Sequence, residues 1–400
     1  MADSAITNIR PTQSGSRARL AELALLFLRL GFTAFGGPAA HIAIMEDEVV
    51  RRRRWLSSER FLDLLGAANL IPGPSSTELA IFIGYEQAGW LGLLLGGVCF
   101  ILPATVMVGA LAWAYVRFGA LPQIAGVLYG IKPVVIAVVF QALWNLAPKA
   151  IKRSVWLGGL GLVACVAFIF GVDALLILLG GGAASIAVRR LTQERPAGRS
   201  FAPSLLGAGM AGAPAAAVQA SGLSLFLVFL KVGAVVFGSG YVLLAFLRAD
   251  LVDRLHWLTE AQLLDAVAVG QVTPGPVFTT ATFIGYVVVA QKGPVMGVWG
   301  AAAATVGIFL PGFLLVALTR PLVARVRRSP LAGAFLDGVN VAALALMAVV
   351  TVQLARSALV DVATILMAAV AAVALVAFKL NTTWLVAGGA VVGAAANALR

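Results

Sequence analysis

Long apolar stretches separated by short polar segments run through almost the whole chain. An open strand edge cannot be satisfied in lipid, so such stretches predict helices. Several are shorter than the ~20 residues that cross ~30 Å of hydrocarbon, and the short ones flank clusters of Gly and Pro. We therefore expect an all-α polytopic membrane protein with discontinuous, re-entrant helices, in about 10–13 helical segments. In the first half the stretches lie near 21–36, 39–50, 60–71, 75–89, 91–117, 121–147, 155–170 and 172–189.

The second half of the chain repeats the first. The run FLRLG at 27–31 matches FLKVG at 229–233 with an offset of 202 residues, and Pro-Gly-Pro occurs at both 72–74 and 274–276. Many matches in the same order predict two homologous repeats. We expect a cytosolic N-terminal tail at 1–19, a first repeat at 20–190, a linker at 191–221 and a second repeat at 222–400.

The basic loop residues favour an inverted arrangement of the two repeats. Four arginines occupy 51–54, whereas the matching loop of the second repeat mixes basic and acidic residues. The next pair of matching loops shows the opposite distribution of charge. The loop around Arg117 in the first repeat has almost no other charged residue, whereas its counterpart in the second repeat contains four arginines between 320 and 328. Basic loops mark the cytosolic side, so the repeats would face opposite ways. Arginines on both flanks of the first repeat imply an even number of crossings instead, unless linker residues 201–219 add one more.

Each repeat contains two interruptions, which we call the first breaks (36–38 and 238–240) and the Pro-Gly-Pro breaks (72–74 and 274–276). Freed backbone groups are costly in lipid, so a break persists where it lines a cavity or binds a ligand. A half-helix that starts at depth directs free N–H groups and a positive dipole end at an anion. Paired breaks therefore favour a midplane substrate site over the alternative, two kinked helices packed through small residues.

Two cations occupy matching positions near the first breaks. Arg29 and Lys231 each lie seven residues before the first Gly of a break, so cation and break share a helix face. A buried cation marks a functional site by default, and we expect both side chains to contact an anion. The alternatives are snorkelling to an interface or pairing with Asp63 or Asp265.

Those two aspartates stand nine residues before the Pro-Gly-Pro breaks. A carboxylate beside a water-filled cavity can carry protons in a coupled cycle, which makes Asp63 and Asp265 coupling candidates. The alternative is structural, as a helix N-cap or as the partner of a nearby cation such as Arg60.

Polar residues next to the Pro-Gly-Pro breaks complete the candidate site. The amides of Asn69 and Gln271 precede the prolines by three residues and can donate hydrogen bonds into the site. Glu78 and Lys132 are accessory candidates, because their counterparts in the second repeat, Thr280 and Asn340, differ from them in chemistry. The expected substrate-binding set is Arg29, Gly36, Gly37, Asn69, Pro72, Gly73, Pro74, Ser75, Lys231, Gly238, Ser239, Gln271, Pro274, Gly275 and Pro276.

Composition excludes several classes of protein. Of 400 residues 12% are charged, against about 25% in soluble domains, and 61% are hydrophobic. The net charge of +12 falls in short loop clusters, which fits membrane topology and not nucleic-acid binding. Two cysteines and two histidines match no metal spacing, and no nucleotide motif or nucleophile–base pair stands out. We expect a protein in a lipid bilayer with no cofactor, no metal and no enzymatic activity.

The paired Phe-Gly-Gly and Pro-Gly-Pro motifs in a duplicated chain of this length resemble the chromate ion transporter family, in its long two-domain form. The second repeat departs from the pattern with Gly-Ser-Gly at 238–240. The resemblance implies export of chromate across the cytoplasmic (inner) membrane, resistance to chromate, and sulfate as a competitor or exchange partner in antiport. The residues themselves argue only for a small oxyanion, since both anions are tetrahedral and divalent. A homodimer is one open alternative for the assembly.

Three hypotheses of different class follow. The first is a secondary transporter that moves a divalent oxyanion by alternating access of two pseudo-symmetric repeats. The second is a passive oxyanion channel, which needs no coupling carboxylate. A membrane enzyme or scaffold is the third, and no motif in the sequence supports it.

Overall fold

The computed structural model describes residues 14–35, 37–119, 121–152, 154–193, 219–237, 240–319 and 330–398. All regular structure in these ranges is helical, and no strand occurs in them. The expected site residues Gly36, Gly238 and Ser239 lie outside the described residues. So do linker residues 194–218 and the basic segment 320–329.

Helices of the first repeat follow the apolar stretches of its sequence. Ser57 caps α3 by accepting a hydrogen bond from the Arg60 N–H, and a proline at the first helical position starts α5. In chain order the elements are α1 (Ser14–Thr33), α2 (Gly37–Glu46), the π-helical turn η1 (Asp47–Arg52), α3 (Ser58–Ala68), α4 (Ser75–Phe118), α5 (Pro122–Ile151), α6 (Val155–Ile169) and α7 (Ala174–Gln193).

The second repeat has the same order of elements, with reciprocal Ser, Thr or Asp capping boxes at the starts of α8, α10 and α15. Its elements are α8 (Gly222–Val235), η2 (Gly240–Val242), α9 (Leu243–Leu247), η3 (Arg248–Arg254), α10 (Glu260–Val272), η4 (Val277–Thr279), α11 (Thr280–Val289), η5 (Ala290–Lys292), α12 (Pro294–Thr319), α14 (Pro330–Ala358), α15 (Val362–Val376) and α16 (Thr382–Ala398).

A tight helical hairpin follows the Pro-Gly-Pro break in each repeat. Non-helical backbone at Ala88 and Gly89 divides α4 into two arms. The arms pack backbone to backbone, since a Cβ on Gly84 would overlap the carbonyl oxygen of Gly92. In the second repeat α11 and α12 form the same hairpin, because a Cβ on Gly285 would overlap the Gly300 carbonyl. Small residues at matching positions allow this close approach in both repeats.

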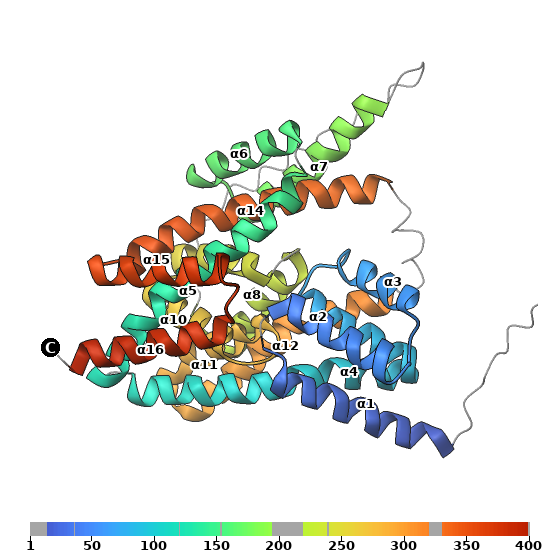
Figure 1. The fold of residues 1–400 in the computed structure, drawn as a ribbon, viewed down its shortest axis with the longest axis horizontal. Coiled ribbons are helices and arrows are strands. Elements are labelled where there is room, and N and C mark those ends of the chain that lie inside the picture. The colour runs from blue at the N-terminus through green and yellow to red at the C-terminus, as the bar shows by residue number, and fades with distance from the viewer. Residues whose placement is uncertain are drawn as a thin grey trace, which may run out of the picture.

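The two hairpins point in opposite directions. In Figure 1 the long arm of α4 runs from right to left, whereas α12 runs from left to right and ends near α3. The helices α5 and α14, which follow these arms, also run in opposing senses. This arrangement is the inverted repeat that the loop charges favoured.

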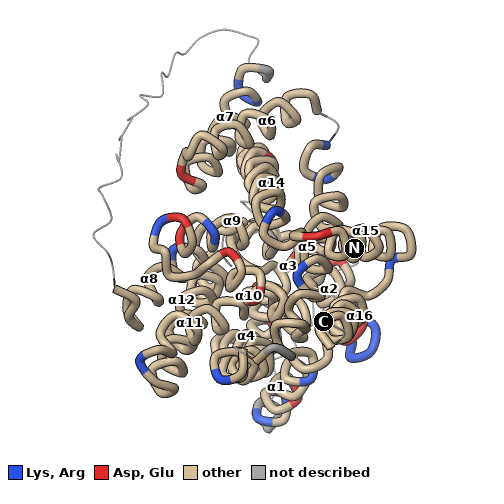
Figure 2. Tube along the Cα trace, turned by 90° about the vertical axis from the view of Figure 1, so that its left-hand side faces the viewer, with Lys and Arg blue, Asp and Glu red and all other residues tan. Residues whose placement is uncertain are grey.

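Five helices of the described chain are long and apolar enough to cross a membrane: α4, residues 124–151 of α5, residues 174–191 of α7, α12 and α14. Viewed along the long axis of the molecule, the trace carries Lys, Arg, Asp and Glu only in short, scattered stretches (Figure 2). Large apolar side chains such as Trp113, Val106 and Trp299 are exposed on the outer surfaces of these helices. Such surfaces suit acyl chains, so the protein is a multi-pass integral membrane protein.

Candidate functional site

The breaks of one repeat are tied to the breaks of the other. The Gly73 N–H donates a hydrogen bond to the Val236 carbonyl (2.7 Å), and the Gly275 N–H donates one to the Ala34 carbonyl (3.0 Å). Ala34 and Val236 are equivalent positions at the offset of 202 residues. Each Pro-Gly-Pro break is therefore held by the residue that stands two positions before the first break of the opposite repeat. The interrupted helices meet in one place between the repeats.

Glycine is required at the centre of both Pro-Gly-Pro breaks. Gly73 has φ +130° and Gly275 has φ +93°. Residues other than glycine rarely adopt this backbone conformation. Space is also short, because a Cβ on Gly275 would lie 2.7 Å from the Ala104 Cβ. A Cβ on Gly73 would overlap Oε1 of Glu78. The crossing of the repeats thus depends on backbone that only glycine allows.

Helices begin directly at both Pro-Gly-Pro breaks. Pro74 precedes the first turn of α4, and Pro276 precedes η4, which leads into α11. The first N–H groups of a helix have no acceptor within it, and the dipole adds partial positive charge there. The side chains in these first turns are polar and almost fully buried, namely Ser75, Ser76, Thr77, Thr279 and Thr280. Buried donors with positive polarity suit a small oxyanion.

His41 of α2 belongs to this centre, although the sequence analysis did not single it out. It is 1% exposed, with Nε2 3.0 Å from the Ala34 carbonyl oxygen and Nδ1 3.3 Å from Oγ of Ser76. A carbonyl can only accept, so Nε2 carries the proton, and Nδ1 of the neutral ring accepts from the Ser76 hydroxyl. Its counterpart, Leu243, cannot make these bonds. A histidine inside an apolar run was the signal available in the sequence.

Two polar atoms in the first turn of α4 are buried without a hydrogen-bond partner among the described residues. They are Oγ1 of Thr77 and Oε2 of Glu78. Glu78 is 1% exposed and folds back over Gly73, while a Cβ on Gly312 of α12 would lie 2.8 Å from its Oε1. Buried polar atoms in native proteins are nearly always bonded, so orphaned atoms at a helix start point to a ligand or a proton.

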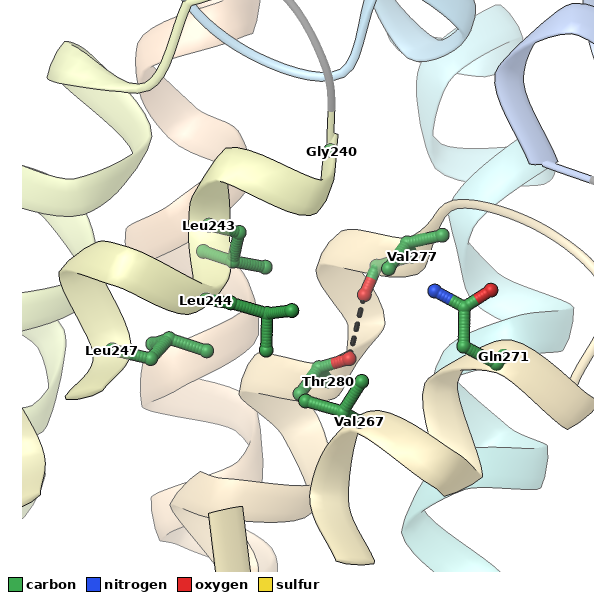
Figure 3. A pocket seen from close by; sticks show the side chains of 8 residues that line it. All are labelled: Gly240, Leu243, Leu244, Leu247, Val267, Gln271, Val277 and Thr280. Atoms are coloured by element: carbon green, nitrogen blue, oxygen red, sulfur yellow. Dashed lines mark hydrogen bonds between the residues drawn. The ribbon is translucent and has the colours of Figure 1, made fainter. Parts of the chain in front are cut away.

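A small pocket lies beside the breaks of the second repeat (Figure 3). Leucines of α9 line one side, and Val277 and Thr280 line the other. The Thr280 hydroxyl donates to the Val277 carbonyl at 2.8 Å. The amide of Gln271, expected as a site residue, lies on the same side. The pocket is therefore apolar except for one amide and one hydroxyl that is already engaged.

Arg29 and Lys231 pair with carboxylates outside the breaks. Nη1 of Arg29 lies 3.9 Å from Glu48 Oε1 in η1, and Nζ of Lys231 lies 3.1 Å from both carboxylate oxygens of Asp250 in η3. Glu48 and Asp250 are themselves equivalent positions. The ion pairs of these two cations are thus with acids that the π-helical turns η1 and η3 bring beside them, and the ion pair of Asp265 is with another residue, Lys132.

Further cations surround the same two acids. Arg52 and Arg53 both reach Glu48 at 3.3 Å, and Arg254 reaches Asp250 at 3.0 Å. The Arg29 side chain is 62% exposed and that of Lys231 34%. Further acids offset the cations around Glu48, because Asp47 lies 2.7 Å from Arg52 and Glu22 pairs with Arg53. Cations and acids therefore balance in that group, whereas Asp250 has two cation partners.

Asp265 forms the most deeply buried ion pair of the described chain, and it crosses the repeats. Its Oδ1 lies 3.2 Å from Nζ of Lys132 in α5, and its Oδ2 accepts from the Tyr115 hydroxyl of α4 at 2.9 Å. The expectation that the aspartates cap helices is wrong, since Ser57 and Thr259 cap α3 and α10. Lys132 thus meets the coupling candidate of the opposite repeat.

The remaining candidates lie around this centre. Asp63 is half-buried in α3, and Arg60, which the sequence suggested as its partner, forms an ion pair with Glu86 at 2.7 Å. Asn69 is exposed where α3 ends. Gly37, inside the first break, has φ +76° and is the first residue of α2. Pro72 and Pro274 precede the crossing glycines.

Fold and site together define a two-repeat membrane protein whose interrupted helices cross between inverted halves, an architecture found in secondary transporters. The family model described as "Chromate transporter" matches twice, over residues 21–186 and 223–394. The chain therefore belongs to the chromate transporter family.

Relatives agree with this assignment. The chain is 36% identical to the chromate transport protein of Cupriavidus metallidurans over 385 residues, which cover 94% of this chain and 92% of that protein. It is 34% identical to the chromate transport protein of Pseudomonas aeruginosa, covering 80% and 77%. The uncharacterized transporter YwrA of Bacillus subtilis is 30% identical over 36% of this chain and 85% of its own length. A relative of about half length fits a duplicated chain. No solved structure matches.

Proposed function

We propose that this protein is a secondary transporter that exports chromate, or a similar tetrahedral dianion such as sulfate, across the cytoplasmic membrane and so confers resistance to chromate. One observation carries the proposal. Helix starts of both repeats converge where Gly73 and Gly275 bind the opposite repeat, and the buried Thr77 hydroxyl of α4 has no partner there among the described residues. Free N–H groups, hydroxyls and positive dipole ends are the chemistry that recognises an oxyanion at depth.

The hydrogen bonds between the two repeats at their breaks suggest how the site could open first to one face of the membrane and then to the other. Each repeat holds the other through one backbone hydrogen bond at an equivalent position. A movement of one inverted repeat against the other would open the centre alternately to the two faces of the membrane. The expected substrate contacts are the first turn of α4, the start of η4 and α11, and the first breaks.

Arg29 and Lys231 act in this proposal as cations that attract the anion on its way to the site. Each pairs with an acid of its own repeat, Glu48 or Asp250, and stays partly exposed. Since the repeats are inverted, the two cations would face opposite sides of the membrane, where a positive side chain raises the local anion concentration.

The test is transport by purified full-length protein in proteoliposomes. We expect accumulation of chromate, competition by sulfate, and a response to an imposed pH gradient. Thr77→Val removes an unpartnered hydroxyl and should weaken chromate affinity about tenfold, because a hydrogen bond to a charged group contributes about 1.5–3 kcal/mol. Thr105→Val is the matched control, since the Thr105 hydroxyl of the same helix already donates to the Ile101 carbonyl at 3.1 Å.

Other outcomes would contradict the proposal. Equal affinity in the Thr77 and Thr105 variants would remove the first turn of α4 from the site. Chromate flux at channel-like rates that ignores the pH gradient would replace the transporter by a passive oxyanion channel.

A further inference from the structure

Glu78 is a buried carboxyl group that the proposed transport site does not yet explain. It lies in the first turn of α4, and its side chain bends back over the helix start toward Gly73. Oε1 also faces Gly312 of α12, so the carboxyl group sits between the two repeats. It is 1% exposed. A carboxyl group in this position occupies space next to the N–H groups that would bind the oxyanion.

No cation among the described residues compensates Glu78, and its Oε2 has no hydrogen-bond partner there. An isolated carboxylate in a membrane interior is expensive, whereas the neutral acid is tolerated. The positive end of the α4 dipole reduces the cost of the charged form. The Glu78 carboxyl group can therefore be either ionised or neutral at the start of α4. Which form it takes depends on whether an anion is bound there.

Charged and titratable groups on the neighbouring elements are paired with other residues or exposed. His41 of α2 approaches the first turn of α4 through Ser76 and is held by the Ala34 carbonyl. The helices α11 and α12 carry no Lys, Arg, Asp, Glu or His. Ion pairs engage Arg29 of α1 with Glu48, Arg60 of α3 with Glu86, and Asp265 of α10 with Lys132. Arg17 and Arg19 of α1 and Glu59 of α3 are exposed.

We propose that Glu78 and the transported oxyanion compete for the start of α4, so that binding of the anion is coupled to uptake of one proton by Glu78. This inference rests on the proposed function. In the empty site the ionised carboxylate uses the positive helix end. When a dianion binds there, the two charges repel, and the carboxylate takes a proton from water to become the neutral acid. The bound complex then holds one anion and one added proton.

Only the first repeat can take up this proton. The counterpart of Glu78 is Thr280, whose hydroxyl does not titrate and donates to the Val277 carbonyl. One titratable group predicts a limiting stoichiometry of one proton per anion. Chromate affinity should then rise by up to about tenfold for each unit that the pH falls, beyond the effect of chromate's own protonation.

The experiment compares chromate binding to purified full-length protein and to E78Q over a series from mildly acidic to mildly alkaline pH. Chromate itself takes up a proton in this range, so the readout is the ratio of the two affinities at each pH, in which the chemistry of the ligand cancels. We expect the ratio of wild-type to E78Q affinity to fall as pH rises, because glutamine mimics the neutral acid at every pH. E86Q is the matched control, since Glu86 lies on the same helix in an ion pair with Arg60, and its profile should follow the wild type.

A ratio that stays constant with pH would overturn the coupling at Glu78 and leave the proposed function intact. Failure of the wild type to bind chromate at any pH would instead overturn the proposed function. If E78Q does not yield folded protein, the proton taken up by wild-type protein on addition of chromate can be measured in weak buffer against a protein-free blank. Uptake approaching one proton per bound anion supports the inference, and none overturns it.

Discussion

The two repeats share a backbone design but differ in chemistry at the point where they cross. Ala34 and Val236 accept equivalent hydrogen bonds from Gly275 and Gly73. Around this symmetric frame the first repeat places His41 and Glu78, where the second has Leu243 and Thr280. Alternating access needs the shared backbone, because both repeats must move in equivalent ways. Because the second repeat has threonine in place of Glu78, the proposed coupling at that position involves a single proton.

A second difference concerns the aspartates before the Pro-Gly-Pro breaks. Asp265 is 3% exposed and binds Lys132 and Tyr115 of the first repeat, whereas Asp63 is half-buried. The counterpart of Lys132 is Asn340, so this position of the second repeat cannot form the equivalent ion pair. The first repeat thus supplies the partner that keeps α10 in place. Substitution of the residues in this ion pair tests whether the difference between the repeats matters for stability.

The largest effect is expected from Lys132→Met. The variant leaves the Asp265 carboxylate buried without its cation, and losing one partner of a buried pair costs about 3–5 kcal/mol. Thermal unfolding and the yield of monodisperse protein should both fall sharply. The double variant K132M/D265N should recover most of the loss, while Asp63→Asn should change stability by about 1 kcal/mol or less. An unimpaired K132M protein would show that the ion pair does not hold the repeats together.

Alanine at the crossing glycines should have the next largest effect. Positive φ strains an alanine by about 1–3 kcal/mol, and overpacking adds a similar amount. Gly275→Ala should be the more damaging, since its Cβ meets Ala104, whereas that of Gly73→Ala meets the movable end of Glu78. Chromate flux and thermal unfolding measure the difference.

Gly171→Ala separates strain from crowding in this comparison. Gly171 has φ +85° with nothing within 4 Å of an added Cβ, so this variant carries the strain alone. It should keep transport near the wild-type rate. Equal losses in all three variants would mean that backbone strain, and not the crossing, limits the protein.

The smallest effect is expected at the cation clusters. Lys231→Ala leaves Asp250 with Arg254, while Arg29→Ala leaves Glu48 with both Arg52 and Arg53. We expect a loss of about 1 kcal/mol or less for Arg29→Ala, which is largely exposed, and a larger loss for Lys231→Ala. The unfolding temperatures of the two variants measure the order of these losses. Initial rates of chromate transport at low and high salt show whether either substitution also weakens the electrostatic attraction between the protein and the anion. The reverse order of stability would contradict these ion pairs as the source of the effect.

What the sequence determined by itself is local or repeated. The apolar stretches predicted the helices, and residues 88–89 interrupt α4 close to the expected end of a segment at 89. Pro and Gly marked breaks at 72–74 and 274–276 because their steric rules act within a few residues. The offset of 202 residues revealed the duplication before any contact was known.

Only the tertiary structure decided which groups meet. Gly73 binds Val236 and not its own repeat, and Lys132 reaches Asp265 across the repeats, because the path of the chain between distant segments sets these partners. Arg29 and Lys231 pair with Glu48 and Asp250 because π-helical turns bring those acids back beside them. Residue types and spacing determine which chemical groups are available in the membrane. The packing of the inverted repeats against each other determines which of those groups meet.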